Sequence, residues 1–268
     1  MTTQDHDDRA LDSAPFGGRP GGALVVGGSG AIGRAVAVRL ARLGSDVTVT
    51  YAGSSAAAGE TAELVVASGR ACDVERLDMG DPGQAAEAVA RAAEQRGGLH
   101  TVVLAASPTN FQSWVSTLPP EQYAEQLRVD SGGSFAVVSA ALPHLRESRG
   151  SVVVVSTVAN RRFVLRDVLS SGPKAANEAL VRAVAAEEGR FGVRANAVGV
   201  GILDEGMTQV LLGTGDVRPE QLEVAVSRVP LGFLGKAADI AAAVGFLASE
   251  DARYVTGQWI DVDGGYGM

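Results

Sequence analysis

Short runs of apolar, often β-branched residues recur along the chain, with helical patterns between them. The predicted strands cover residues 23–27, 46–51, 71–78, 100–106, 150–156, 193–199 and 257–265. The predicted helices cover residues 31–43, 55–68, 82–96, 119–146, 172–190 and 239–248, the fourth with an interruption at Gly132 and Gly133. Continuous apolar strands that alternate with helices are typical of a parallel sheet covered on both faces. The pattern therefore predicts the α/β class, with a doubly wound parallel sheet of about seven strands in a single domain.

Two segments fall outside this pattern. Residues 1–20 are polar and rich in Gly and Pro, which predicts a mobile N-terminal tail before a domain that covers residues 21–268. The tail lacks a basic start followed by an apolar stretch, so it is not expected to be a secretory signal. Residues 202–236 lack strand character and contain several glycines, which predicts a mobile lid over a binding site.

Composition and charge narrow the range of partners. Of the 268 residues, 46% are hydrophobic and 20% are charged, enough for a large buried core. The net charge of −8 argues against a nucleic-acid partner, and no apolar run approaches the roughly 20 residues of a membrane helix. Cys72 is the only cysteine, which rules out an intrachain disulfide and favours the cytoplasm. One Cys and three scattered His predict no metal site.

A glycine-rich turn follows the first predicted strand and opens the first predicted helix. Gly27, Gly30 and Gly33 permit a tight turn and a close approach of the backbone to a ligand. The helix that follows would offer free N–H groups to a pyrophosphate. At the first strand–helix junction of a doubly wound sheet, these features predict a dinucleotide site at the carboxyl edge of the strands.

From about Gly22 to the C-terminus, the sequence resembles the short-chain dehydrogenase/reductase (SDR) superfamily. The resemblance rests on the turn from Gly27 to Gly33, on Asp78-Met79, the pair that flanks adenine in the family, and on residues 254–265, which match its C-terminal strand. It implies a Rossmann-like fold, an NAD(P)-dependent oxidoreductase and a homo-oligomer, either a dimer or a tetramer. The residues that it places at the cofactor are Gly27, Ser29, Gly30, Ala31, Ile32, Gly33, Tyr51, Ser54, Asp78, Met79, Ala105, Ala106, Lys174, Gly201 and Ile202.

The end of the second predicted strand bears on the type of nicotinamide nucleotide. An acidic residue there would bind the ribose 2′-hydroxyl and repel a 2′-phosphate, but residues 50–55, TYAGSS, contain no acid. Ser54 and Ser55 could donate hydrogen bonds to a phosphate, although the basic residue usual in phosphate-binding members is missing. We therefore expect NADP(H) to be preferred, with NAD(H) as the alternative.

The resemblance also implies a catalytic Asn-Ser-Tyr-Lys set, of which this chain keeps only part. Lys174 matches the lysine, and Thr157 matches the serine and keeps a hydroxyl. Asp130 stands at the position of the asparagine, and Ser170, four residues before Lys174, at the position of the tyrosine. An aliphatic hydroxyl is a far weaker acid than a phenol, whose pKa is about 10. The sequence thus predicts an atypical member that lacks the tyrosine of the YxxxK motif.

A second pattern resembles the enoyl-thioester reductase branch, which places its tyrosine seven residues before the lysine. Asp167 stands at that position here. A carboxyl group there could polarise a thioester carbonyl only in its protonated form, which burial favours and a nearby lysine opposes. The alternative is that Asp167 is a solvated or ion-paired surface residue.

Two functions remain open from the sequence. The first is an atypical NADP(H)-dependent SDR oxidoreductase that reduces a C=C or C=O bond of a small or thioester-linked substrate. The alternative is a nucleotide-binding protein of the same fold without redox activity, either a regulator or an acid–base enzyme that uses Asp130, Asp167 or Lys174.

Overall fold

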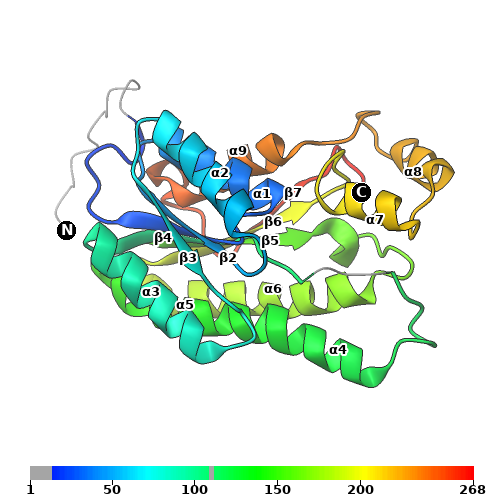
Figure 1. Ribbon diagram of the computed structural model, residues 1–268, viewed down its shortest axis with the longest axis horizontal. Coiled ribbons are helices and arrows are strands. Elements are labelled where there is room, and N and C mark those ends of the chain that lie inside the picture. Colours follow the sequence, from blue (N-terminus) through cyan, green and yellow to red (C-terminus); the bar gives the residue numbers. More distant parts are fainter. Residues whose placement is uncertain (1–13, 109–111) are drawn as a thin grey trace.

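The computed structural model describes residues 14–108 and 112–268, and these form one α/β domain around a parallel sheet (Figure 1). Seven strands pair within the described residues, in the order β3-β2-β1-β4-β5-β6-β7, and every neighbouring pair is parallel. The strands are β1 (Gly22–Val26), β2 (Val47–Tyr51), β3 (Cys72–Arg76), β4 (Leu99–Leu104), β5 (Ser151–Thr157), β6 (Arg194–Val200) and β7 (Trp259–Val262). The predicted fold class is confirmed.

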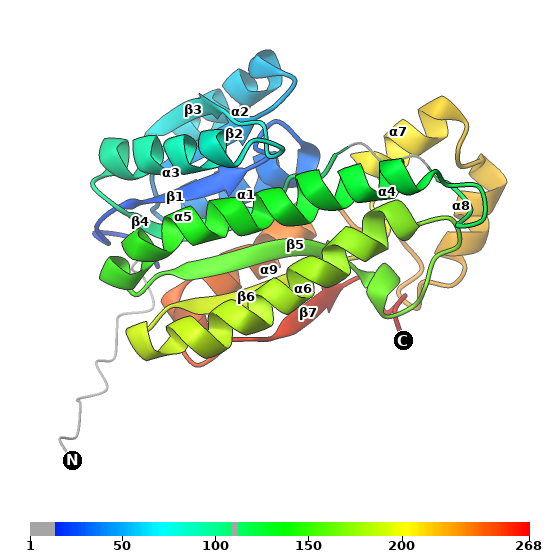
Figure 2. The same ribbon diagram turned by 90° about the horizontal axis from the view of Figure 1, so that it is seen from below.

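Helices cover both faces of the sheet (Figures 1 and 2). One face carries α1 (Ala31–Arg42), α2 (Ser55–Ala67) and α9 (Ala237–Ala248). The other carries α3 (Pro82–Arg96), α4 (Pro120–Leu127), α5 (Gly133–Ser148) and α6 (Val168–Glu188). Within the described residues, none of the helices is both long enough and apolar enough to cross a membrane.

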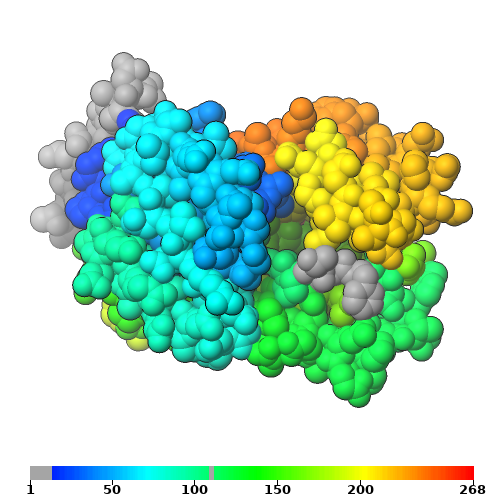
Figure 3. Space-filling view, in the orientation of Figure 1, coloured from blue at the N-terminus to red at the C-terminus, as the bar shows by residue number. Residues whose placement is uncertain are grey.

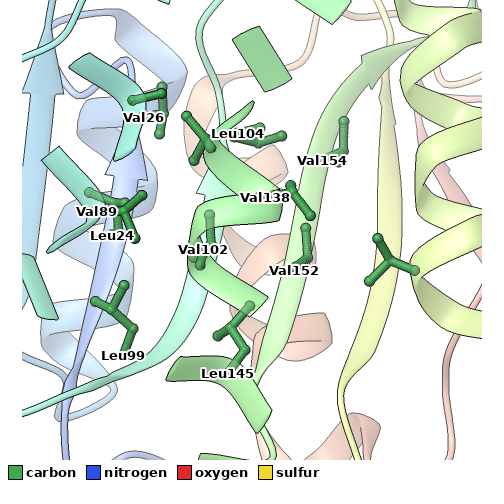
Figure 4. Close-up of a cluster of buried hydrophobic side chains, with 14 of the residues drawn as sticks. Leu24, Val26, Val89, Leu99, Val102, Leu104, Val138, Leu145, Val152 and Val154 are labelled. Atoms are coloured by element: carbon green, nitrogen blue, oxygen red, sulfur yellow. The ribbon is translucent and has the colours of Figure 1, made fainter. Parts of the chain in front are cut away.

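The strands read as continuous apolar runs because both of their faces are buried. In β1, Leu24 and Val26 point into one core and Ala23 and Val25 into the other, as expected from the two-residue period of a strand. Figure 4 shows the first core, in which side chains of β1, β4 and β5 pack against α3 and α5. The labelled residues are Leu24, Val26, Val89, Leu99, Val102, Leu104, Val138, Leu145, Val152 and Val154.

Part of the predicted tail differs from expectation. Phe16 is 1% exposed and stacks on the His100 ring, with centroids 5.0 Å apart. Arg19 forms an ion pair with Glu250 over 3.3 Å and donates hydrogen bonds to the carbonyls of residues 148 and 149. Residues 14–20 are therefore anchored to the domain, because an aromatic side chain and a guanidinium find partners at the amino edge of the sheet. Residues 1–13 lie outside the described residues.

The predicted helix 119–146 consists of two α-helices that follow each other as one continuous helical segment. Between α4 and α5 lies a short π-helical segment, Arg128–Gly132, so the glycine pair does not interrupt the helix. Gly133 instead allows a close approach, since a Cβ there would lie 2.3 Å from the Met79 carbonyl oxygen. Single π turns inside α-helices are frequent at functional sites.

The segment 202–236 contains two short helices that the sequence did not predict. These are α7 (Met207–Thr214) and α8 (Pro219–Val226), and they lie beyond the carboxyl ends of β5, β6 and β7 (Figure 1). Neither has a buried residue, so neither contributes to the core of the domain.

Candidate active site

The turn after β1 packs closely against the rest of the chain only because it is built from glycines. Gly27 has a φ of +89°, and a Cβ on it would lie 2.7 Å from the Ala106 backbone nitrogen. A Cβ on Gly33 would lie 2.1 Å from the Gly27 carbonyl oxygen. Gly30, the N-cap of α1, has no side chain with which to bind the first N–H groups of the helix. The N–H groups of Ala31 and Ile32 therefore have no side-chain cap from Gly30, and their use by a pyrophosphate stays a prediction.

The end of β2 borders this turn. The Gly27 N–H donates to the Thr50 hydroxyl over 3.2 Å, and a Cβ on Gly28 would lie 2.5 Å from the Val49 Cβ. Tyr51 ends the strand half-buried, and Ser54 caps α2 by accepting from the Ala57 N–H over 3.2 Å. The Ser54 oxygen is thus occupied as an acceptor, while its proton is available to a ligand.

The remaining predicted cofactor residues lie at the carboxyl ends of β3, β4 and β6. Asp78 is exposed and accepts from the Gly80 N–H over 2.8 Å, while Met79 is buried. The Ala105 N–H donates to the Val26 carbonyl over 2.9 Å, which holds the β4 loop against the glycine turn. Two further residues follow β6: a Cβ on Gly201 would lie 2.5 Å from the Asp263 Cα, and Ile202 accepts from the Gly235 N–H over 3.1 Å.

The structure brings Asp130 and Lys174 together as a buried ion pair. Asp130 is fully buried in the π-helical segment, and its Oδ2 lies 2.9 Å from Lys174 Nζ. Lys174 Nζ also donates to the Ala106 carbonyl over 3.3 Å, which ties it to the loop beside the glycine turn. Asn177 Nδ2 donates to Asp130 Oδ1 and Ser107 Oγ to Oδ2, each over 2.9 Å. The buried carboxylate is therefore both paired and hydrogen-bonded.

The sequence reasoning missed Asn177 and Ser107 as members of this network. Asn177 lies three residues after Lys174 on α6, a spacing that places both side chains on one face of a helix. That spacing was the available signal for Asn177. Ser107 follows β4 in a loop, and only the tertiary structure brings it to Asp130.

Asp167 and Ser170 lie together at the start of α6. Asp167 is the N-cap of the helix, yet its side chain binds no backbone N–H there, and the Ser170 N–H donates to its backbone carbonyl over 2.9 Å, which brings the Ser170 hydroxyl within reach of the carboxyl. Burial raises the pKa of the Asp167 carboxyl to about 7, and the Ser170 hydrogen bond opposes that rise. The two positions at which the two resembled branches carry their tyrosine are thus in contact with each other.

Thr157 ends β5 at the same edge of the sheet. It is half-buried, and its hydroxyl oxygen accepts from the Ala159 N–H over 3.1 Å, so its proton is available to a ligand. Figure 3 shows a hollow between the glycine turn and α7. No group of three or more His, Cys, Asp or Glu is placed to hold a metal ion in the part of the chain that the structure describes.

The chain is similar to oxidoreductases over nearly its whole length. The family model described as "Enoyl-(Acyl carrier protein) reductase" matches residues 27–267. Versicolorin reductase stcU of Emericella nidulans is 32% identical over 249 residues, which are 91% of this chain and 94% of that protein.

Solved structures show the same likeness. Carveol dehydrogenase from Mycobacterium avium, in complex with NAD, has a TM-score of 0.85 at 26% identity, over 94% of this chain and 99% of its own. A blue fluorescent protein from a metagenomic library, in complex with NADPH, has a TM-score of 0.84 at 28% identity. The likeness covers 95% of this chain and 100% of that protein. The chain therefore belongs to the short-chain dehydrogenase/reductase superfamily of oxidoreductases.

Proposed function

We propose that the protein is an NADP(H)-dependent reductase that acts on a C=C or C=O bond of a small or thioester-linked substrate. The observation that carries this proposal is the hydrogen bond from Lys174 Nζ to the Ala106 carbonyl. It places the ammonium group beside the loop that packs on Gly27, where a dinucleotide at the glycine turn would extend along the carboxyl edge of the sheet.

The residues of this edge fit a nicotinamide dinucleotide. The start of α1, from Gly30 to Gly33, would hold the pyrophosphate, and Asp78 and Met79 would flank the adenine. On the nicotinamide side, the cofactor would meet Ala105, Ala106, Lys174, Gly201 and Ile202. When bound, the nicotinamide supplies the hydride, and the protein supplies orientation and the proton.

A preference for NADP(H) follows from the end of β2. Residues 50–55 carry no acid that would repel a 2′-phosphate. Ser54 has a free hydroxyl proton, and the first N–H groups of α2 add positive potential at the same place. Arg34 forms an ion pair with Glu60 over 2.7 Å and joins α1 to α2, so we assign it no phosphate contact.

The match to the enoyl-reductase family model favours a C=C bond conjugated to a thioester as the reduced group. In that reaction the Thr157 hydroxyl would orient the carbonyl oxygen, on which negative charge develops when hydride adds to the β-carbon. Segment 202–236, with α7 and α8, would close over the substrate. Gly206, the N-cap of α7, lies against Ala31, since a Cβ on it would be 3.5 Å from the Ala31 Cβ.

We also expect a homo-oligomer, a dimer or a tetramer, at work in the cytoplasm. Phe135 on α5 is 60% exposed and Phe246 on α9 is 41% exposed, and burial of such side chains favours association. The free thiol of Cys72 suits a reducing compartment.

The experiment is a fluorescence titration of the purified protein with NADPH and NADH, followed by a substrate screen. Enoyl-thioesters, ketoacyl-thioesters and simple ketones are offered with NADPH, and the nicotinamide absorbance is followed. We expect tighter binding of NADPH and oxidation by an enoyl-thioester. Binding of neither nucleotide would overturn the proposal, and so would binding without oxidation by any of the acceptors.

A further inference from the structure

The start of α6 carries an aspartate in an unusual setting. Asp167 occupies the N-cap position, where an aspartate commonly accepts from a backbone N–H, but its carboxyl makes no such bond, and the Ser170 N–H, which donates to the Asp167 carbonyl over 2.9 Å, holds the Ser170 hydroxyl within reach of that carboxyl. The residue before it, Arg166, has a φ of +67°, a conformation that is uncommon outside glycine. Hydrogen bonds hold it there, since its guanidinium donates to the Gln112 carbonyl over 2.8 Å and its own carbonyl accepts from the Ser113 N–H over 3.0 Å. Strained backbone of this kind clusters at functional sites.

Asp167 and Ser170 lie at the start of α6, close to Lys174 and the candidate site. Ser170 and Lys174 are four residues apart, and Asn177 follows three residues later, so all three share one face of the helix. Lys174 is bound to the loop beside the glycine turn. Ser170 therefore lies one helical turn from the lysine, and Asp167 adjoins Ser170 on the side away from it.

The charged groups around this end of α6 are engaged elsewhere, and Glu121 on α4 is exposed. The engaged groups are Lys174 with Asp130, Arg161 with Glu178 and Asp261, Arg162 with the Tyr266 carbonyl, Arg166 with the Gln112 carbonyl, and Glu125 with Arg128. The uncharged Tyr123 packs against Gly172, where a Cβ would lie 2.6 Å from its hydroxyl oxygen. Among the described residues, burial and the Ser170 hydroxyl are thus the influences on the Asp167 carboxyl, whose pKa rises to about 7.

We propose that Asp167 and Ser170 act together as the proton donor of the reductase, with Ser170 as the relay and Asp130 as the residue that shields them from the charge of Lys174. The inference rests on the proposed function. It differs from a simple replacement of the tyrosine, because the acid and the group that touches the substrate are two separate residues.

The proton passes to the substrate from Asp167 through Ser170. Hydride addition to the substrate carbon shifts the π electron pair toward the substrate oxygen, directly in a ketone and through the conjugated system in an enoyl-thioester. The Ser170 O–H bond breaks as the new O–H bond on the substrate forms, and the Asp167 carboxyl gives its proton to the Ser170 oxygen. Asp167 is left as a carboxylate and regains a proton from water. The enol formed from an enoyl-thioester then tautomerises to the saturated thioester.

In this scheme the negative charge of Asp130 offsets the positive charge of Lys174. A free ammonium group one to two helical turns away would favour the carboxylate form of Asp167 and so remove its proton. The buried carboxylate of Asp130, 2.9 Å from Lys174 Nζ, cancels most of that field. Asp130 is therefore a positioning residue, which holds Lys174 and preserves the acid form of Asp167.

The first test needs no substrate and no nucleotide. Carboxyl groups of the full-length protein are titrated by infrared or carbon-13 spectroscopy in wild type, Asp167→Asn and an exposed control, Asp251→Asn. We expect one carboxyl that titrates near neutrality, lost in Asp167→Asn and kept in Asp251→Asn. Asp130→Asn should shift that titration to lower pH, and the double variant Asp130→Asn/Lys174→Met should restore it. An unchanged titration in Asp130→Asn would overturn the shielding role, and the absence of a near-neutral carboxyl in wild type would overturn the whole inference.

The second test uses turnover with NADPH. Wild-type kcat should fall as pH rises through the titration of Asp167, because the donor must be protonated. Asp167→Asn and Ser170→Ala should each lower kcat by roughly 10²–10⁴-fold, the usual worth of general acid catalysis. Ser170→Thr, which keeps a hydroxyl, should recover most of the rate.

Measurement of NADPH affinity distinguishes failure of the proton-donor proposal from failure of the proposed function. If the variants bind NADPH normally and keep the wild-type rate and pH profile, the donor pair is wrong while the reductase assignment stands. If wild type itself binds no nucleotide, the proposed function fails, and the spectroscopic titration still decides the state of Asp167.

Discussion

Lys174 Nζ lies 2.9 Å from Oδ2 of a fully buried Asp130, so the lysine of the candidate site is one half of an internal ion pair. Removal of one member of a buried pair leaves an uncompensated charge and commonly costs about 3–5 kcal/mol. We therefore predict that Lys174→Met lowers the free energy of unfolding in urea by about that amount. The double variant Asp130→Asn/Lys174→Met should recover most of the loss, because no buried charge remains. Additive losses in the double variant would show that the pair is not the source of the effect.

The glycine turn gives a steric prediction for nucleotide binding. A Cβ on Gly33 would lie 2.1 Å from the Gly27 carbonyl oxygen, so Gly33→Ala must displace the backbone that cradles the pyrophosphate. We expect Gly33→Ala to abolish NADPH binding in a fluorescence titration. Gly59→Ala in α2 is the matched control, since a Cβ there meets no atom within 4 Å among the described residues. Normal NADPH binding by Gly33→Ala would contradict the assignment of the turn.

The fold and the glycine turn were predictable from local pattern, whereas the side-chain contacts of the candidate site were not. Buried strands such as β1 can be recognised in the sequence as apolar runs, and the glycine turn comes directly after β1. The Asp167–Ser170 contact was hidden because Gly172 and Pro173 resemble a helix start, and the predicted helix began at residue 172. The helix begins at Val168 and carries Pro173 in its interior, which puts Ser170 one turn before Lys174. The Asp130–Lys174 pair joins residues 44 positions apart, and no local spacing predicts such a contact.

The cofactor preference can be tested at Ala52, which follows Tyr51 and is exposed. An acid at the end of β2 repels a 2′-phosphate and binds a ribose 2′-hydroxyl. We predict that Ala52→Asp weakens NADPH binding at least about tenfold, roughly 1.4 kcal/mol, and leaves NADH binding equal or stronger. The neutral Ala52→Asn separates charge from size and should leave NADPH affinity nearly unchanged. Equal losses for both nucleotides in Ala52→Asp would indicate a local distortion and would refute this placement of the 2′-phosphate.

His100 gives a prediction about acid stability. It is fully buried between Phe16 and the sheet, with its Nδ1 3.0 Å from the Thr101 hydroxyl, and burial lowers its pKa from 6.5 to about 3. The unfolded chain therefore binds a proton that the folded chain excludes once the pH falls below 6.5. The stability contributed by the neutral ring is complete above that pH and is lost as the pH falls toward the folded pKa, at up to about 1.4 kcal/mol per pH unit. Urea unfolding between about pH 7 and pH 5 should show this slope in an Asp167→Asn background, because the Asp167 carboxyl, whose folded pKa is about 7, gives wild type an opposing slope over the same range. His100→Gln removes the titrating group and should flatten the slope, even though its stability at neutral pH falls. A slope that is unchanged in His100→Gln would assign the acid sensitivity to another group.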